Sequence, residues 1–473
     1  MKNYKYILLF ATLYLGAACT DLVDDVNDDL TELSADVIPP EKFLTGAQLA
    51  NVLAQVGHAN RISGLYTGQL TGFAAQYKNI YDYTLTSEET ESTWNRIYQG
   101  VVPQTRLIIS KLEGENALLH GICQVMEAHV IGTAATLFGD IPYEEIFIEG
   151  LEDPKFDEQA TVLANVQLLL DEAIDNLNVA ATGVISEDIY YNGDKQKWLE
   201  TAWSLKARYY MQTKEYSSAY SAAQNGISTA SNNMNFIPIG DSSITGSKNT
   251  YFTLLNGSRA GDIGTQGSYF SGLLDPSGTT SRNHAKTDET ARFEYMTVDQ
   301  TDGVSNRGVA SEFEPQRMVT YEETMLALAE AGARTVDFNT GLGHLNTYRQ
   351  FLNTGAFLNV HFNARPYTYS DYIEADFQAG GLENADNIAQ DRALLREIIE
   401  ERYVSGFMTY MPFDDARRLR SASESDIAVS IPFNTSTATV HPERLVYPDN
   451  EINTNANIPS PLPDLYTVTD INQ

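Results

Sequence analysis

Residues 195–230 read KQKWLETAWSLKARYYMQTKEYSSAYSAAQNGISTA. Trp203, Ala207 and Tyr210 are spaced along one predicted helix, and Ala219 and Ala223 along the next. This succession of large and small residues is typical of a tetratricopeptide repeat, in which two antiparallel helices pack closely. Small side chains let the two helices approach each other, while Trp203 and Tyr210 fill the space toward the neighbouring pair. The stretch therefore predicts one helical hairpin of a repeat array.

Helical periodicity extends well beyond this hairpin. Apolar residues recur on one helical face over residues 161–177 and again over residues 390–402. Residues 321–351 predict a second hairpin, with Gly341-Leu342-Gly343 near its turn. Because one or two hairpins cannot bury their apolar faces alone, further pairs are expected, and the predicted fold class is all-α. The inward face of the second hairpin is predicted to hold Met325, Leu328 and Ala329.

A long segment of different composition interrupts the helical pattern. Residues 235–316 are rich in Gly, Ser, Thr, Asn and Tyr, and short runs such as Phe236–Ile239 are typical of strands. Segments this long without helical periodicity are uncommon inside compact proteins, and those that occur are often functional. We therefore expect residues 39–473 to form one helical-repeat domain with a loop-rich, ligand-binding insertion at about 235–316.

The N-terminus predicts export and a lipid anchor. Residues 1–18 combine a basic start with an apolar run that ends in Gly16-Ala17-Ala18, directly before Cys19. A run this short is typical of a secretory signal rather than of a membrane span. The pattern predicts cleavage before Cys19 and acylation of its thiol, followed by an acidic, flexible tether over residues 19–38. The alternative is an ordinary secretory signal in which the cysteine is incidental.

The composition argues against nucleic acid as a partner. The chain carries 31 basic and 63 acidic residues and a net charge of −32 at pH 7. Such a surface repels phosphate backbones, and it favours a neutral or cationic ligand over an anionic one. The chain has two cysteines. If Cys19 carries lipid, Cys123 has no partner and is predicted to be a small buried residue.

No motif in the sequence supports an enzyme, a cofactor or a metal site. The adjacent acids Glu144-Glu145, Glu322-Glu323 and Asp414-Asp415 point in different directions on a helix, whereas a glycosidase needs two carboxylates facing each other across about 5–10 Å. The seven histidines include no pair at the i, i+4 spacing of a zinc helix. Asp140 and the run 299–306 offer oxygen ligands for calcium but lack the spacing of an EF-hand. We therefore predict a non-enzymatic protein without cofactor or metal.

Two clusters of aromatic and planar polar residues are better suited to binding a ligand. Sugars and peptides bind to flat aromatic faces and to hydrogen-bonding side chains on rigidly held loops. One cluster lies in the glycine-broken segment 66–83 and the other in the insertion. For each aromatic residue, the alternative is packing in the core. The predicted ligand-binding residues are Tyr66, Phe73, Gln76, Tyr77, Asn79, Tyr81, Tyr251, Arg259, Tyr269, Phe270, Arg282 and Asn283.

Five motifs, in order along the chain, resemble those of one known family. Together they are similar to the SusD/RagB family, the outer-membrane nutrient-binding lipoproteins of Bacteroidetes. The motifs are Cys19, Leu137–Tyr143 (LFGDIPY), Thr320–Ala331 with its TYEE start and AEA end, Ile398–Arg418 with IIEER followed by Phe413, Asp415 and Arg417, and Arg444–Glu451 (RLVYPDNE).

The resemblance implies a fold and a function. The fold is mostly helical, with four tetratricopeptide-like hairpins, which agrees with the spacing at 195–230. The function is that of a lipid-anchored protein at the cell surface, which captures oligosaccharide or peptide and delivers it to a SusC-like, TonB-dependent outer-membrane transporter. Residues 405–412 lack the Glu-Gly-x-Arg run of many members. This difference indicates a divergent SusD-like branch, so starch is not carried over as the ligand.

Two other functions remain open at this point. A surface glycoside hydrolase would share the anchor and the aromatic residues, but it needs a facing pair of carboxylates in a cleft. A helical-repeat adaptor would bind protein partners, and no small ligand would stabilise it. The sequence does not decide between a glycan and a peptide as the ligand.

Overall fold

The computed structural model describes residues 37–240, 246–298 and 306–473. The predicted signal segment, Cys19 and nearly all of the tether lie outside the described residues, as does most of the candidate calcium run at 299–306. Those predictions therefore stay predictions. Within the described part of the chain, no helix combines the length and the apolar character needed to cross a bilayer.

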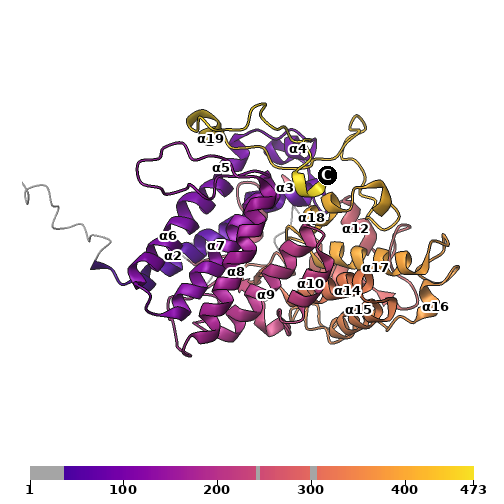
Figure 1. Ribbon diagram of the computed structural model, residues 1–473. Helices are drawn as coiled ribbons and strands as arrows, with labels where there is room; N and C mark the ends of the chain where they lie inside the picture. The colour runs from indigo at the N-terminus through magenta and orange to yellow at the C-terminus, as the bar shows by residue number, and fades with distance from the viewer. Residues whose placement is uncertain (1–36, 241–245, 299–305) are drawn as a thin grey trace, which may run out of the picture.

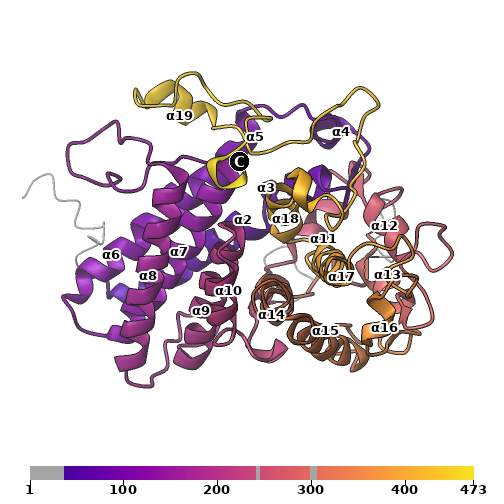
Figure 2. The ribbon, with the colours of Figure 1, turned by 45° about the vertical axis from the view of Figure 1, so that its right-hand side comes forward.

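Consecutive helices pack side by side as hairpins and form the main body of the protein (Figure 1). Three hairpins follow one another: α7 with α8, α9 with α10, and α14 with α15. Neighbouring hairpins contact each other through α8 and α9 and through α10 and α14, and the array continues from α14 to α17 and α18 (Figure 2). The predicted all-α, tetratricopeptide-like architecture is thus confirmed. The helices are α7 (Ala117–Phe138), α8 (Gln159–Val179), α9 (Lys195–Gln212), α10 (Tyr216–Ala223), α14 (Tyr321–Thr335), α15 (Phe338–Asn353), α17 (Gln390–Ser405) and α18 (Met411–Arg418).

The hairpin of α9 and α10 forms as predicted, but α9 is buried on a different face. Trp198 is completely buried, and its indole Nε1 donates a hydrogen bond to Asp188 Oδ2 at 2.8 Å. Tyr209 is also buried, and its hydroxyl donates to the carbonyl of His129 on α7 at 2.9 Å. Trp203 and Tyr210, which were predicted to fill the gap to the neighbour, are only partly buried at the edge of the core. Their lesser burial follows from the packing of α9 against α7, which the spacing within residues 195–230 does not reveal.

The second predicted hairpin also exists. Met325, Leu328 and Ala329 are buried as expected. The glycine run, however, lies in the first turns of α15, because the chain turns earlier, between α14 and α15 at residues 336–337. A Cβ atom at Gly341 would lie 2.5 Å from the Cβ atom of Ala333 on α14. Glycine at this position therefore allows α14 and α15 to approach closely.

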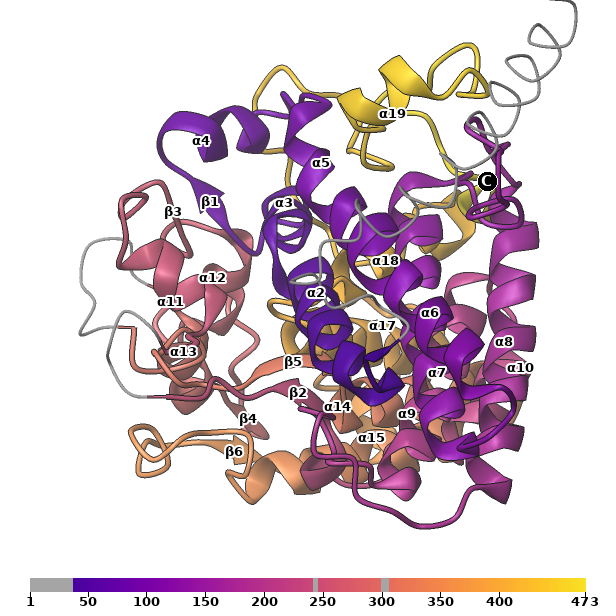
Figure 3. The ribbon, with the colours of Figure 1, turned by 90° about the vertical axis from the view of Figure 1, so that its left-hand side faces the viewer.

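The insertion at 235–316 contains short strands, as expected, but the run predicted at 236–239 is a strand only at Phe236, because β2 covers Met234–Phe236 and Ile237 and Ile239 are exposed. It also contains three short helices that the sequence did not predict. The helices are only six or seven residues long, too short to show helical periodicity, although Asn249 and Ser268 accept capping hydrogen bonds at the starts of two of them. Figure 3 shows these helices on the side of the molecule opposite to α8 and α10. They are α11 (Thr250–Leu255), α12 (Tyr269–Leu274) and α13 (Thr290–Met296).

Three two-stranded antiparallel sheets tie the insertion to the rest of the chain. β1 (Thr71–Gly72) pairs with β3 (Ile263–Gly264), and β2 (Met234–Phe236) pairs with β5 (Gln316–Val319). β4 (Thr287–Asp288) pairs with β6 (Thr368–Tyr369). β2 and β5 lie at the two borders of the insertion and pair with each other. β3 and β4 lie in its middle and pair with β1 and β6, which lie outside it. The insertion is therefore held at both ends and in its middle.

The remaining elements complete the two ends of the array and the connections. The main apolar core extends from Leu44 to Leu465 and includes Cys123, which is completely buried as predicted. The C-terminal segment crosses the molecule beside α5 (Figure 1). These elements are η2 (Pro40–Phe43), α2 (Leu44–Val56), α3 (His58–Tyr66), α4 (Ala75–Tyr81), α5 (Glu88–Asn95), the π-helix η3 (Arg96–Val101), α6 (Val102–Leu112), η4 (Ala230–Asn232), α16 (Glu374–Phe377), η5 (Ala422–Glu424), α19 (Asp449–Thr454) and η6 (Asp470–Asn472).

Two of the sequence motifs contact each other in the fold. The Arg444 guanidinium donates to the carbonyl of Phe138, and the Tyr447 hydroxyl donates to the carbonyl of Asp140 at 2.6 Å. Leu445 N also donates to the carbonyl of Leu137 at 2.8 Å. Gly139 between them has a φ of +80°, which disfavours any residue with a Cβ atom. The RLVYPDNE segment therefore fastens the C-terminal part of the chain to the end of α7.

Candidate functional site

Five of the twelve predicted ligand-binding residues lie inside the protein. Tyr251 donates its hydroxyl to Asn60 Oδ1 at 2.8 Å, and Phe270 stacks on Phe407 with ring centroids 4.4 Å apart. Side chains that are packed in this way present no face to a ligand, because other segments of the chain cover them. The alternative of core packing therefore describes these five in this structure. They are Tyr66, Tyr77, Tyr251, Phe270 and Arg282.

The other seven reach the surface to different extents. Asn79 and Arg259 are exposed, and Arg259 is paired with Asp262 at 3.2 Å. Gln76 donates a hydrogen bond to Glu89, which also contacts His58. Ligand contact by these residues stays a prediction. The half-buried members are Phe73, Gln76, Tyr81, Tyr269 and Asn283.

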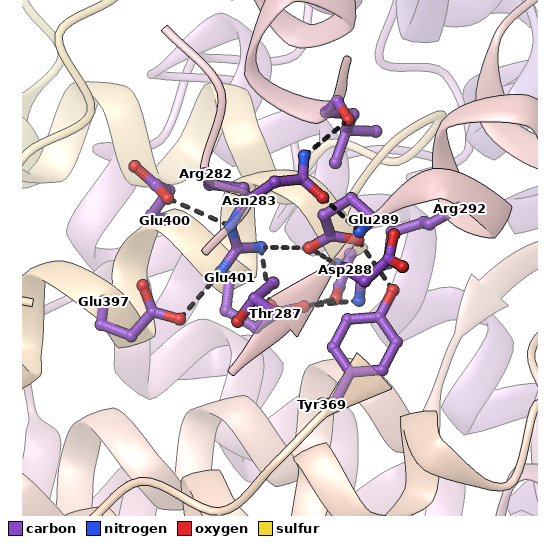
Figure 4. A network of polar contacts seen from close by, with 12 residues as sticks. Arg282, Asn283, Thr287, Asp288, Glu289, Arg292, Tyr369, Glu397, Glu400 and Glu401 are labelled. Atoms are coloured by element: carbon purple, nitrogen blue, oxygen red, sulfur yellow. Dashed lines mark hydrogen bonds and ion pairs between the residues drawn. The ribbon is translucent and has the colours of Figure 1, made fainter. Parts of the chain in front are cut away.

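Arg282 belongs to a buried ion-pair network that joins the insertion to α17 (Figure 4). Its guanidinium donates to Glu401 at 2.7 Å and to Glu397 at 2.8 Å. Arg292 on α13 donates to the second oxygen of Glu401, also at 2.7 Å. Glu289 lies 3.2 Å from Arg282 and accepts a hydrogen bond from Tyr369 next to it. We name Arg282, Glu289, Arg292, Glu397 and Glu401 the clamp.

The clamp also holds Asn283, another predicted ligand-binding residue. The Asn283 side chain accepts a hydrogen bond from Glu289 N at 2.6 Å and donates to the carbonyl of Leu274 at 3.1 Å. With both ends of its amide in use, Asn283 orders the chain between α12 and α13. Arg282 and Asn283 together thus have a structural role, which their position in a loop-rich segment concealed.

The two glutamates that α17 contributes to the clamp differ in their pKa values. Burial would raise the pKa of Glu401, but Arg292 and Arg282 outweigh burial and hold that pKa at about 2. Burial raises the pKa of Glu397 well above its ordinary value, in spite of Arg282. Glu401 is therefore the ionised partner of both arginines, and Glu397 takes up a proton more readily than Glu401 does.

The candidate site is an open groove of about 640 Å³ beside α13. It lies between the loop after β3, the exposed side of α12 and α13, and the segment that follows α15. Phe293 and Phe362 supply aromatic surface, and Gln266, Arg307 and Arg365 supply planar polar groups. We call it the α13 groove. Its lining consists of Thr265, Gln266, Gly267, Ser271, Phe293, Glu294, Thr297, Val298, Arg307, Phe362 and Arg365.

Contacts around the α13 groove fix its two walls relative to each other. Asn359 donates to the carbonyl of Arg307 at 2.7 Å and to Glu314 at 2.9 Å, so the segment after α15 is tied to the end of the insertion. The ring of Phe362 packs edge-on against Tyr295 of α13, with centroids 5.9 Å apart. The two walls of the groove are thus held together by side chains from segments that lie far apart in the sequence.

None of the twelve predicted residues lines the α13 groove. Tyr269 and Phe270 come closest in sequence, since Ser271 directly after them does line it. Phe293 and Arg307 lie inside the predicted insertion, but Phe362 and Arg365 lie outside it. Phe293 and Arg307 could have been predicted from the same signal as the insertion itself: aromatic and planar polar residues in a segment without long helices.

Other candidates among the described residues are weaker. A second open pocket of about 350 Å³ is lined by four carboxylates, Arg396, Leu382 and Ala385, and it has no aromatic surface. No group of three potential metal ligands gathers anywhere in the described ranges. Asp140, one of the proposed calcium ligands, accepts a hydrogen bond from Gln159 N at 2.9 Å at the start of α8.

A family model described as starch-binding and associating with the outer membrane matches residues 32–448. The chain belongs to the SusD-like family. This assignment confirms the resemblance drawn from the five motifs. No curated protein matches the SusD-like chain.

Solved structures of SusD homologues share the fold of this SusD-like protein. A SusD/RagB family protein from Bacteroides thetaiotaomicron is 20% identical, with a TM-score of 0.62 over 89% of this chain and 95% of its own. A SusD homologue from Bacteroides uniformis is 18% identical, with a TM-score of 0.65 over 92% and 99%. A chitin-binding SusD homologue from Flavobacterium johnsoniae is 17% identical, with a TM-score of 0.61 over 87% and 93%.

Proposed function

We propose that this SusD-like protein is a nutrient-binding lipoprotein of the outer membrane, which captures an oligosaccharide in the α13 groove and delivers it to a TonB-dependent transporter. The proposal is supported by the family, whose description names starch binding and the outer membrane. One solved homologue is described as chitin-binding, so glycan binding occurs on this fold. The lipid anchor at Cys19 and the transporter partner are parts of the proposal.

The composition of the α13 groove is the observation that carries the proposal. Pockets for small ligands commonly measure about 300–1,000 Å³ and combine apolar surface with a few orienting polar groups. The groove, at about 640 Å³, lies within this range. The face of a sugar ring packs on an aromatic side chain, and its hydroxyls bond to planar groups. Phe293 offers the first, and Gln266, Arg307 and Arg365 offer the second.

The carboxylates of the groove favour binding over hydrolysis as its function. Among the described residues that line it, Glu294 alone carries a carboxylate, and that carboxylate is paired with Arg365 at 2.8 Å. A glycoside hydrolase needs two carboxylates on opposite sides of the scissile bond. This count supports a protein that captures a sugar and releases it unchanged.

Calorimetric titration of the purified protein with a panel of neutral and charged oligosaccharides tests the ligand. Replacing Phe293 by alanine removes the half-buried aromatic wall, and we expect about tenfold weaker binding, or about 1.4 kcal/mol. Phe147 is a matched control, because it is exposed on the connection between α7 and α8. Phe147→Ala should bind as the parent does. Equal loss in both variants, or no binding by any oligosaccharide, would refute the proposed site.

The transporter partner requires a separate experiment. The protein, expressed with its own N-terminus in its native host and extracted gently from outer membranes, should co-purify with a TonB-dependent barrel. Recovery of the lipidated protein alone, under conditions that preserve other outer-membrane complexes, would contradict this half of the proposal and leave sugar binding untouched.

A further inference from the structure

We propose that the α13 groove selects oligosaccharides that carry carboxylate groups, such as chains of uronic acids. This inference rests on the proposed function and names the chemical class of its ligand. It depends on two arginines of the groove, Arg307 and Arg365: within the described ranges Arg307 has no carboxylate partner, and Arg365 has one, Glu294.

Arg307 is exposed at the groove and lacks an acidic partner among the described residues. Its backbone carbonyl is held by Asn359, so the position of the residue is fixed while its guanidinium remains available. In this acidic protein most arginines are paired with carboxylates, as Arg282, Arg402 and Arg418 are in the core. Among the described residues, an arginine that lines a groove without a carboxylate partner is therefore unusual, and a ligand carboxylate can pair with it.

Arg365 forms an ion pair with Glu294 that is open to solvent. Its Nε lies 2.8 Å from Glu294, with 54% of the arginine side chain and 33% of the glutamate side chain exposed. Neither terminal nitrogen of Arg365 donates a hydrogen bond to a described residue. An exposed ion pair of this kind contributes about 0–1 kcal/mol to stability. Glu294 therefore orients Arg365, and the guanidinium can still bind a second carboxylate.

The local charge of the groove differs from that of the whole protein. Its described lining carries two arginines and one glutamate, which gives a charge of +1, whereas the chain has −32. At physiological ionic strength, charges more than about 8 Å apart are largely screened when they are exposed. The arginines in contact with a ligand therefore outweigh the distant acids. The preference for neutral or cationic ligands, expected from net charge, does not extend into the groove.

The polar lining favours a sugar over an acidic peptide. The hydroxyls of Ser271 and Thr297 donate their hydrogens to the carbonyls of Ser268 and Phe293. Their oxygens can still accept hydrogen bonds, which the many hydroxyls of a sugar supply. A peptide would instead bind best along a free strand edge. β3, the strand beside the groove, is two residues long and already paired with β1.

Titration with matched pairs of oligosaccharides tests this inference. Each pair consists of a uronic-acid oligosaccharide (of galacturonate, glucuronate or mannuronate) and its methyl ester, which is the same sugar without the charge. We expect at least one acid to bind ten times more tightly than its ester. Arg307→Gln and Arg365→Gln should each weaken binding of the acid about three- to tenfold and weaken binding of the ester by a clearly smaller factor, because the ester lacks the charge that the arginines pair with. Arg96→Gln, at an exposed arginine outside the groove, should have no effect.

The outcomes separate this inference from the proposed function. If a neutral oligosaccharide binds and no acid binds more tightly than its ester, selection for carboxylates is refuted and sugar capture stands. If an oligoglutamate peptide binds and no sugar does, both the glycan class and the proposed function fail. If acids bind but the Arg307 and Arg365 variants bind them equally well, the site assigned to the carboxylate is wrong.

Discussion

Arg282 and Glu401 form a buried ion pair in which the guanidinium Nη1 lies 2.7 Å from the carboxylate Oε2. Arg282 lies in the loop-rich insertion and Glu401 on α17, and both side chains are almost fully buried. The pair fastens the insertion, which carries most of the α13 groove, to the helical array. The pair therefore holds the segment that supplies most of the groove lining against α17.

Replacing Arg282 by methionine should destabilise the protein strongly. The change leaves Glu397 and Glu401 buried with one arginine fewer, and breaking a buried pair by removing one partner typically costs about 3–5 kcal/mol. Chemical denaturation measures the free energy of unfolding. Arg259→Met is the control, because Arg259 forms only an exposed pair with Asp262, whose loss should cost less than about 1 kcal/mol. Equal stability of the two variants would contradict the role of the clamp.

Acid should weaken the fold through two buried glutamates. The pKa of Glu401 is about 2, and so is that of Glu330, because burial is outweighed by the arginines around each. Carboxylates with a lowered pKa stabilise the folded state above their unfolded pKa of about 4.3, and this stabilisation is lost as the pH falls toward 2. Each group contributes on the order of 3 kcal/mol.

Denaturation curves between pH 7 and pH 2.5 measure this dependence. We expect the free energy of unfolding to fall below about pH 5. Glu401→Gln should have lower stability at neutral pH and a shallower fall on acidification, since one of the two groups no longer titrates. A variant with the full slope of the parent would show that Glu401 is not one of the groups responsible.

Gly132 on α7 should tolerate no side chain. A Cβ atom there would lie 2.1 Å from the ring of Tyr209, which is fixed by its hydrogen bond to His129. Gly132→Ala should therefore cost about 1–3 kcal/mol of stability by overpacking. Gly46→Ala on α2 is the control, since nothing lies within 4 Å of its added methyl group and alanine favours helix. Gly46→Ala should leave thermal stability unchanged or raise it. Equal melting temperatures of the Gly132→Ala and Gly46→Ala variants would argue against close packing of α7 and α9.

Cys19→Ala should release the protein from the membrane without changing its ligand. Without the thiol no acyl chain can be attached, and the predicted anchor is lost. Cell fractionation and mass spectrometry of the mature N-terminus measure this, while titration of the purified variant should give the affinity of the parent. Retention in the outer membrane would show that residues other than Cys19 attach the protein.

The family motifs could be recognised in the sequence because their residues contact near neighbours or form specific pairs with one another. Arg444 and Tyr447 bind the turn at 137–143, and Arg418 donates to both oxygens of Glu330 at 2.7 and 2.6 Å. These contacts join parts of the scaffold. They identify the family well, but they lie in the framework and say nothing about which side chains meet a ligand.

The sequence alone determined the periodic long helices, two of the hairpins and the family. Helix formation depends on neighbours three and four residues apart, so the pattern is visible in any short window such as 195–230. Only the tertiary structure revealed the candidate site. Whether a loop aromatic is buried depends on segments far along the chain. Tyr251 is covered by α3, while Phe293 remains half-exposed beside Phe362 and Arg365, which lie about 70 residues further on.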